Sequence, residues 1–227
     1  MSEVAALLAE AADDFFRREC PTEKAGTADP ELVARFARAG LMEEAGLEDA
    51  AIVVSAAARY GAQLPLIEDW LATQPEADRR RLGAVLSCAQ IAGALERALQ
   101  FTVEHVTTRQ QFGVPIVRFQ AVAHQLAQLA EETAAARAAA DGASADSQEW
   151  KVAAAKVRCG EAAAKGAEIA HQLHGAIGFT NEHALRHFSA ILWQARDRFG
   201  TETEWAIQLG RHVAASGDPW RLLTESV

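Results

Sequence analysis

Apolar residues recur every three or four positions along most of this chain. One series comprises Phe119, Val122, Ala123, Leu126, Leu129 and Ala130, and a second comprises Leu82, Val85, Leu86, Ala89, Gly93 and Leu99. This spacing places side chains on one face of an α-helix. No run of alternating apolar and polar residues is long enough to predict a strand. The pattern therefore predicts an all-α fold.

Polar residues and glycines mark where the helices should begin and end. Asp29 followed by Pro30 is typical of a helix start. Two pairs have the spacing of a capping box, Asp146 with Glu149 and Thr201 with Glu204. Helix ends are expected at Gly40, Gly61 and Gly142, and in the loop 174–179.

The chain divides near residues 72–83, where Pro75 and a cluster of charges separate two helical regions. Residues 1–74 form an N-terminal helical region with about four short helices. Residues 78–227 form a bundle, whose long helices are joined by turns at 109–116, 142–146, 174–181 and 199–201. Long helices with short connections are typical of a bundle of antiparallel helices.

Composition excludes several classes of protein. A formal charge of −9 argues against a nucleic-acid partner held by its phosphates. No apolar run reaches the ~20 residues that span a bilayer, so no membrane partner is expected. The acidic start "MSEVAALLAEAADDFF" does not resemble an export signal, and the cysteines Cys20, Cys88 and Cys159 lie far apart. These features predict a cytoplasmic protein.

One stretch interrupts the helical pattern. "TRQQFGVPIVRFQAVAHQLA" brings together an arginine, a phenylalanine, a glycine and a proline before a helix resumes. A break in a helix costs stability, so we expect the turn to serve a function. Arg109 and Phe112 are the side chains that such a turn would present outward.

Two segments carry a resemblance to a known family. "TRQQFGVPIVRFQAVAHQLAQLAEETAAAR" resembles the C-terminal helical domain of acyl-CoA dehydrogenases, with its R-x-x-F-G-x-P-I-x-x-F-Q signature. "AAAKVRCGEAAAKGAEIAHQLHGAIGFTNEHALRHF" is similar to the family's lysine-containing helix and its Q-x-x-G-G-x-G-F/Y loop. The resemblance is continuous from about Leu82 to Ala215, and it is looser over the N-terminal region.

The family's middle domain is missing. In full-length members a β-rich domain between the helical parts holds the flavin ring and part of the acyl-CoA. Here the chain passes from Leu71 to Leu82 with no room for it. The chain thus resembles the short subunits of heteromeric acyl-CoA dehydrogenases, known from bacterial breakdown of steroid side chains, which pair with a longer subunit.

The resemblance implies a set of residues that bind FAD. Arginine offers a planar fork of donors that suits a pyrophosphate, and the family arginine matching Arg109 reaches the FAD pyrophosphate of a neighbouring subunit. The matching aromatic lies against the cofactor, and the matching glutamine contacts its adenine end. The expected cofactor contacts are Arg109, Phe112, Gln120, Gln172, Gly175 and Thr201.

Simpler interpretations of these residues stay open. Arg109 could be a surface arginine at a helix C-terminus, where the helix dipole favours it. Gly175 and Gly178 could serve a helix cap and turn without any ligand. Ala176 stands where the family usually has its second glycine, and its methyl group could restrict the backbone.

No catalytic residue is predicted. The family's glutamate base commonly precedes a Gly-Thr pair, but this chain has Phe199 before Gly200 and Thr201. The family's other location for the base falls near Gly83, and neither residue can accept a proton. Asp197 lies two positions away, which turns it about 200° around a helix.

No metal site is predicted either. Glu168 and His171 have the spacing of a di-iron ligand pair, but a di-iron bundle needs a second such pair and further glutamates. The histidines of 171–187 do not form a convincing zinc set.

We therefore expect a subunit of an FAD-dependent acyl-CoA dehydrogenase, which desaturates an acyl-CoA thioester between its α and β carbons. A longer partner would supply the glutamate and the flavin-ring domain, and would hold most of the acyl-CoA, in a two-plus-two heterotetramer. The alternative is a flavin-free helical scaffold derived from the same family.

Overall fold

The computed structural model describes residues 2–218 and 220. Its α-helices are α1 (Glu3–Glu19), α2 (Pro30–Ala39), α3 (Leu47–Arg59), α4 (Leu66–Ala72), α5 (Arg79–Thr108), α6 (Gln120–Ala145), α7 (Glu149–His174), α8 (Leu185–Asp197) and α9 (Glu202–Ser216). Short 3₁₀ segments are η1 (Thr22–Lys24), η2 (Glu76–Asp78), η3 (Ile116–Arg118) and η4 (Gly175–Phe179). The prediction of an all-α fold is confirmed. The structure adds one small hairpin, in which β1 (Gln110–Gln111) pairs antiparallel with β2 (Val114–Pro115).

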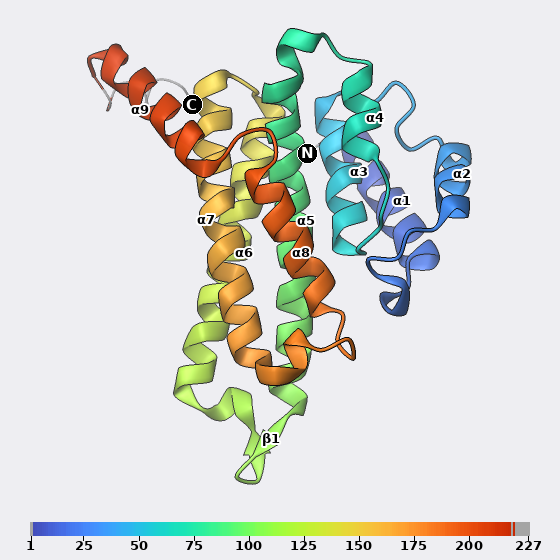
Figure 1. Cartoon of the computed structure of the whole chain (residues 1–227), viewed down its shortest axis with the longest axis vertical. Helices are drawn as coiled ribbons and strands as arrows, with labels where there is room; N and C mark the ends of the chain where they lie inside the picture. The colour runs from blue at the N-terminus through green and yellow to red at the C-terminus, as the bar shows by residue number, and fades with distance from the viewer. Residues whose placement is uncertain (1, 219, 221–227) are drawn as a thin grey trace.

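The long helices α5, α6 and α7 pack against one another with α8 alongside (Figure 1). The N-terminal helices α1–α4 lie on one side of this bundle, where α3 packs along α5. The hairpin projects from the lower end, and α9 leaves the upper end on the side opposite α1–α4 (Figure 1).

Helix α5 contributes side chains to two hydrophobic cores. One of its sides, with Val85 and Ile91, packs with α6, α7, α8 and α9. Another side, with Leu82 and Leu86, packs with α1–α4. Whether residues 1–74 and 78–227 are separate domains stays a prediction. The same helix, with the turn before it, is the one candidate membrane span among the described residues; its apolar window is 78% buried inside the protein, as a core helix would be.

Several predicted helix boundaries are confirmed. Asp29 caps α2 by accepting the Glu31 N–H, and Gly40 ends it with φ 65°. At the start of α9, Thr201 and Glu204 form the reciprocal capping box. These signals are local to the chain, so the sequence was sufficient to find them.

Two predicted boundaries between α6 and α7 were wrong. Helix α6 continues through Gly142 to Ala145, because Ala140 and Ala143 stay buried on either side of the glycine. Asp146 does not cap α7, which begins at Glu149. Its carboxylate instead accepts the Gln148 N–H and pairs with Lys151, so it stabilises the connecting turn.

A buried lysine fixes the end of α8. Lys156 on α7 is 1% exposed, and its Nζ donates to the carbonyl oxygens of Ala195 (2.7 Å) and Arg196 (3.0 Å). Burial lowers its pKa below the ordinary value for lysine. These bonds satisfy carbonyls that a helix end leaves without partners, and they place the turn 198–201 that follows.

Candidate cofactor-binding site

The break at 108–119 is a hairpin tip that presents its side chains to solvent. Helix α5 ends at Thr108, and the Ile116 N–H donates to the Arg109 carbonyl oxygen at 2.9 Å, which closes the loop. Phe112 and Gly113 both have positive φ, 52° and 81°. A phenylalanine in this conformation is strained, and such strain clusters at functional sites.

Three predicted residues are displayed around this hairpin. Phe112 is 92% exposed and touches only the edge of the Phe119 ring, with centroids 6.1 Å apart. Arg109 is exposed and has no carboxylate partner among the residues the structure describes. Gln120 is exposed at the first position of α6. An unpaired arginine, an exposed aromatic ring and an amide therefore share one end of the bundle.

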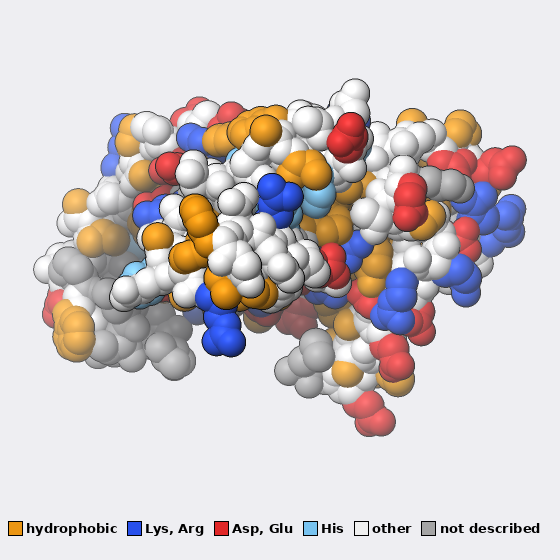
Figure 2. All heavy atoms as spheres, turned by 90° about the horizontal axis from the view of Figure 1, so that it is seen from below, with side chains coloured by type: hydrophobic (Ala, Val, Ile, Leu, Met, Phe, Trp, Pro, Cys, Tyr) orange, Lys and Arg blue, Asp and Glu red, His pale blue; other side chains and the backbone are white. Residues whose placement is uncertain are grey.

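Gln172 and Gly175 lie at the same end. Gly175 ends α7 with φ 65° and ψ −146°, and both residues are exposed. His105 from the last turn of α5 stacks on His174 from the last turn of α7, with ring centroids 4.6 Å apart. This contact ties the Gly175 loop to the helix that carries Arg109. Figure 2 views the molecule from this end, where hydrophobic, basic and histidine side chains lie together.

A shallow hollow of about 650 Å³ lies beside Gly175. It is lined by Ala164, Ala167, Glu168, His171, Gln172, Gly175, Phe179 and Trp193. Phe179 and Trp193, which are 71% and 47% exposed, were not predicted from the sequence as site residues. An aromatic residue beside a glycine turn, as in "GF", was the available signal for Phe179.

Histidines fill the space between the helix ends. Burial, with smaller contributions from the neighbouring histidines, lowers the pKa of His174 to about 4. Its ring is therefore neutral near pH 7, and Nδ1 donates to the Ala170 carbonyl oxygen at 2.8 Å. Burial also lowers the pKa of His105, with smaller contributions from the charges of His183 and Arg109.

Thr201 lies elsewhere. Its hydroxyl oxygen accepts the Glu204 N–H at the start of α9, beside the first turns of α5. Arg109 follows the last residue of this 30-residue helix, so the two residues are separated by about 40 Å along it. Within one chain the structure places Arg109, Phe112, Gln120, Gln172 and Gly175 at the same end of the bundle, with Thr201 toward the other end. The hollow lined by Gln172 and Gly175 does not include Arg109, Phe112 or Gln120.

The two positions expected for the base meet in space. A Cβ atom added to Gly83 would lie 2.6 Å from the Phe199 ring. Phe199 has φ 59° and packs against both cores. An aromatic ring thus occupies the place where either glutamate would stand. Asp197, the nearest acid in sequence, ends α8 and lies near Arg196.

Ala176 does not strain the loop. The residue is exposed, and it is not among the positive-φ residues of the described chain. Its methyl group is therefore compatible with the backbone that η4 adopts.

Within residues 2–218 and 220, no group of three or more His, Cys, Asp and Glu side chains is placed to hold a metal ion. His171 directs Nε2 to the Ser189 hydroxyl at 2.7 Å, and its ring stacks on Phe179.

Residues 79–196 match the family model described as "Acyl-CoA dehydrogenase, C-terminal domain". The match covers more than half of the chain and spans the hairpin and the Gly175 loop. The bundle is therefore an acyl-CoA dehydrogenase C-terminal domain, and the chain belongs to the acyl-CoA dehydrogenase family.

Two curated relatives come from Mycobacterium tuberculosis. Acyl-CoA dehydrogenase IpdE2 is 43% identical over 102 residues, which cover 45% of this chain and 32% of that protein. Acyl-CoA dehydrogenase FadE27 is 29% identical over 200 residues, which cover 80% of this chain and 50% of that protein. The chain thus spans a third to a half of the length of these relatives.

Solved structures share the fold over nearly the whole chain. The ChsE4-ChsE5 complex from Mycobacterium tuberculosis matches with a TM-score of 0.81 and 16% identity, covering 94% of this chain and 98% of that one. A variant of the Tcur3481-Tcur3483 steroid acyl-CoA dehydrogenase matches with a TM-score of 0.85 and 16% identity, covering 95% and 99%. The first is a complex of two different proteins, and the second is likewise named for two proteins.

Proposed function

We propose that this chain is a subunit of a heteromeric, FAD-dependent acyl-CoA dehydrogenase and is inactive alone. It would complete the adenosine-pyrophosphate part of a flavin site whose ring-binding domain and glutamate come from a longer partner. The observation that carries the proposal is that exposed Arg109 and Phe112 lie at the same end of the bundle as exposed Gln172 and Gly175.

The residues present fit this part of FAD. A Cβ at Gly113 or Gly175 would meet nothing within 4 Å, so both backbones are open to a close approach by a ligand. Arg109 would bind the pyrophosphate, Phe112 would cover an apolar face, and Gln120 and Gln172 would donate or accept at the adenosine. When bound, FAD supplies the acceptor for the hydride that leaves the substrate's β carbon.

This chain would offer no group that accepts the substrate's α proton at the position of the family's base. Phe199 fills the space beside Gly83, and an aromatic ring cannot abstract the α proton. The partner's glutamate would therefore carry out that step. The ChsE4-ChsE5 complex, which shares this fold, supports assembly with a second kind of subunit. We propose a two-plus-two stoichiometry for that assembly.

Purification of the chain alone and after co-expression with a longer acyl-CoA dehydrogenase subunit tests the proposal. We expect the chain purified alone to be colourless and inactive. We expect the co-expressed proteins to form a hetero-oligomer that shows flavin absorbance and acyl-CoA turnover. Measurable turnover by the isolated chain would overturn the proposal. Separate species in light scattering, or a colourless complex, would favour the alternative of a flavin-free scaffold.

A further inference from the structure

A second cleft, far from the hairpin, lies between the N-terminal helices and the middle of α5. Its volume is about 250 Å³, and it is lined by Arg17, Cys20, Pro21, Thr22, Tyr60, Arg97 and Gln100. A water molecule takes about 30 Å³ in the liquid, so the cleft has room for a small hydrated ion. Two of its lining residues are cationic.

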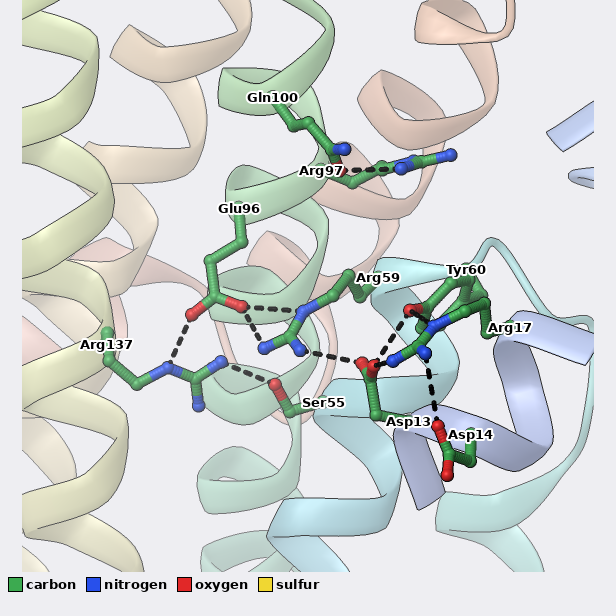
Figure 3. A network of polar contacts seen from close by, with 10 residues as sticks. All are labelled: Asp13, Asp14, Arg17, Ser55, Arg59, Tyr60, Glu96, Arg97, Gln100 and Arg137. Atoms are coloured by element: carbon green, nitrogen blue, oxygen red, sulfur yellow. Dashed lines mark hydrogen bonds and ion pairs between the residues drawn. The ribbon is translucent and has the colours of Figure 1, made fainter. Parts of the chain in front are cut away.

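The carboxylates near this cleft are engaged by arginines other than Arg97. Asp13 accepts from Arg17, from Arg59 at 3.0 Å and from Tyr60 at 3.0 Å. Glu96 accepts from Arg59 and from Arg137, the latter at 2.8 Å. Figure 3 shows this network joining α1, α3, α5 and α6.

Arg97 stands outside the network. In Figure 3 its side chain leaves α5 in a different direction from Glu96, toward Gln100 and away from Arg59 and Arg137. Its Nη1 donates to Gln100 Oε1 at 2.6 Å, and its Nη2 donates to Thr22 Oγ1 at 2.5 Å. Both acceptors are neutral, and no carboxylate among the described residues pairs with Arg97.

The guanidinium group of Arg97 is held in place although its charge is not neutralised. It lies 4.5 Å over the Phe101 ring, and its Nε is buried without a hydrogen-bond partner. A half-buried cation without a counter-charge costs free energy, which an anion in the cleft would recover. The same arrangement fixes the planar donor group before a ligand arrives, which lowers the entropic cost of binding.

The opposite wall adds further donors. Arg17, with 62% of its side chain accessible, pairs with Asp13 and Asp14 and donates to the Tyr60 hydroxyl at 3.4 Å. Ion pairs at this exposure are weak, so a phosphate in the cleft would compete with these groups for its donors. The Thr22 oxygen accepts from Arg97, which leaves its hydroxyl proton free to be donated into the cleft. The Gln100 amide nitrogen is a further donor.

We propose that this cleft binds a small oxyanion of the phosphate class, with Arg97 as its anchor and Arg17 on the facing wall. The ligand is a free phosphate or a phosphomonoester. Phosphate suits the site because guanidinium groups bind its oxygens through paired, charge-assisted hydrogen bonds. The proposal is independent of the flavin contacts, which lie at the end of the bundle.

Isothermal titration of the full chain with inorganic phosphate at constant ionic strength tests this site. We expect saturable binding that is about 10- to 100-fold weaker in Arg97→Gln, because a hydrogen bond to a charged group contributes a few kcal/mol. Arg38→Gln, a change at an exposed arginine of α2 outside the cleft, should bind as the wild type does. Circular dichroism should show the same helical content in all three proteins.

Two further titrations identify the source of the phosphate group. Tighter binding of AMP than of phosphate, lost in Arg97→Gln, indicates a phosphomonoester ligand, whereas equal or weaker binding indicates free phosphate. Absence of saturable binding by either probe overturns the proposal. So does equal affinity of the wild type and Arg97→Gln. If the variant instead fails only to assemble with the longer subunit, the cleft is a protein contact and the proposal is wrong.

Discussion

At the scale of single residues, Arg109 is an exposed arginine that follows the end of a helix. Arginines such as Arg59 and Arg137 pair with carboxylates and hold helices together. Arg109 stands at a turn without such a partner, where truncation opens no cavity in the core. Its side chain is therefore available for a ligand, and its removal should affect binding more than folding.

We predict that Arg109→Ala in the hetero-oligomer lowers FAD affinity by about ten- to a hundredfold, while the helical fold is retained. The reason is the loss of a charge-assisted contact of roughly 1.5–3 kcal/mol. FAD occupancy at limiting flavin measures the effect. Arg118→Ala, at an exposed arginine of η3 outside the matched motif positions, is the control. Equal occupancy in wild type and Arg109→Ala would mean that the hairpin is only a turn.

The contact between Gly83 and Phe199 gives a second prediction at this scale. Gly83→Ala should destabilise the protein by about 1–3 kcal/mol, because the added methyl group overlaps the Phe199 ring. Phe199→Leu in the same chain should recover part of that loss, with a coupling energy of about 0.5–3 kcal/mol. Urea denaturation of the wild type, the two single variants and the double variant measures this coupling energy. Additive losses would show that the two positions do not meet.

At the scale of elements, the contact of α3 with α5 depends on a glycine. A Cβ at Gly93 would lie 2.0 Å from the carbonyl oxygen of Ser55 on α3. Because the obstructing atom belongs to a helix backbone, it cannot move aside as a side chain can. The close approach of these helices therefore requires glycine at this position of α5.

We predict that Gly93→Ala destabilises the protein by about 3 kcal/mol or more, at the upper end of overpacking costs. Gly142→Ala is the matched control, because it also lies in a long helix but a Cβ there meets nothing within 4 Å. That variant should gain up to about 1 kcal/mol from helix propensity. Thermal unfolding compares the two, and similar effects of both changes would contradict the packing argument.

At the scale of the whole molecule, buried histidines make stability depend on pH. Burial lowers the pKa values of His105, His171, His174, His183 and His187. Each of these histidines binds a proton more readily in the unfolded chain than in the folded one. Acidification below the ordinary histidine pKa therefore favours unfolding.

We predict that the histidine contribution to stability is lost as the pH decreases from 6.5 toward 4, where His174 becomes protonated in the folded state. His174 alone should account for on the order of 3 kcal/mol across this window. Urea denaturation at pH 6.5 and pH 4 measures the slope, which should be smaller in His174→Leu. His124→Gln, at an exposed histidine of α6, should keep the wild-type slope. An unchanged slope in His174→Leu would contradict the prediction.

Local signals in the sequence were enough for most of the fold. Helical periodicity, the Asp29 cap and the Thr201–Glu204 capping box depend on residues close in the chain, and the structure confirms them. The boundaries near Gly142 and Asp146 were wrong because buried alanines on both sides of the glycine keep α6 helical. Packing prevailed there over local propensity.

The sequence by itself determined the all-α class, the family and the residues of the hairpin turn, because periodicity and motifs are properties of neighbouring residues. Only the tertiary structure decided which distant residues meet. It set Phe199 against Gly83, separated Thr201 from Arg109 by the length of α5, and left Arg97 beside a cleft without a carboxylate partner. These relations arise because packing of helices brings together residues far apart in the chain, and no local pattern encodes such contacts.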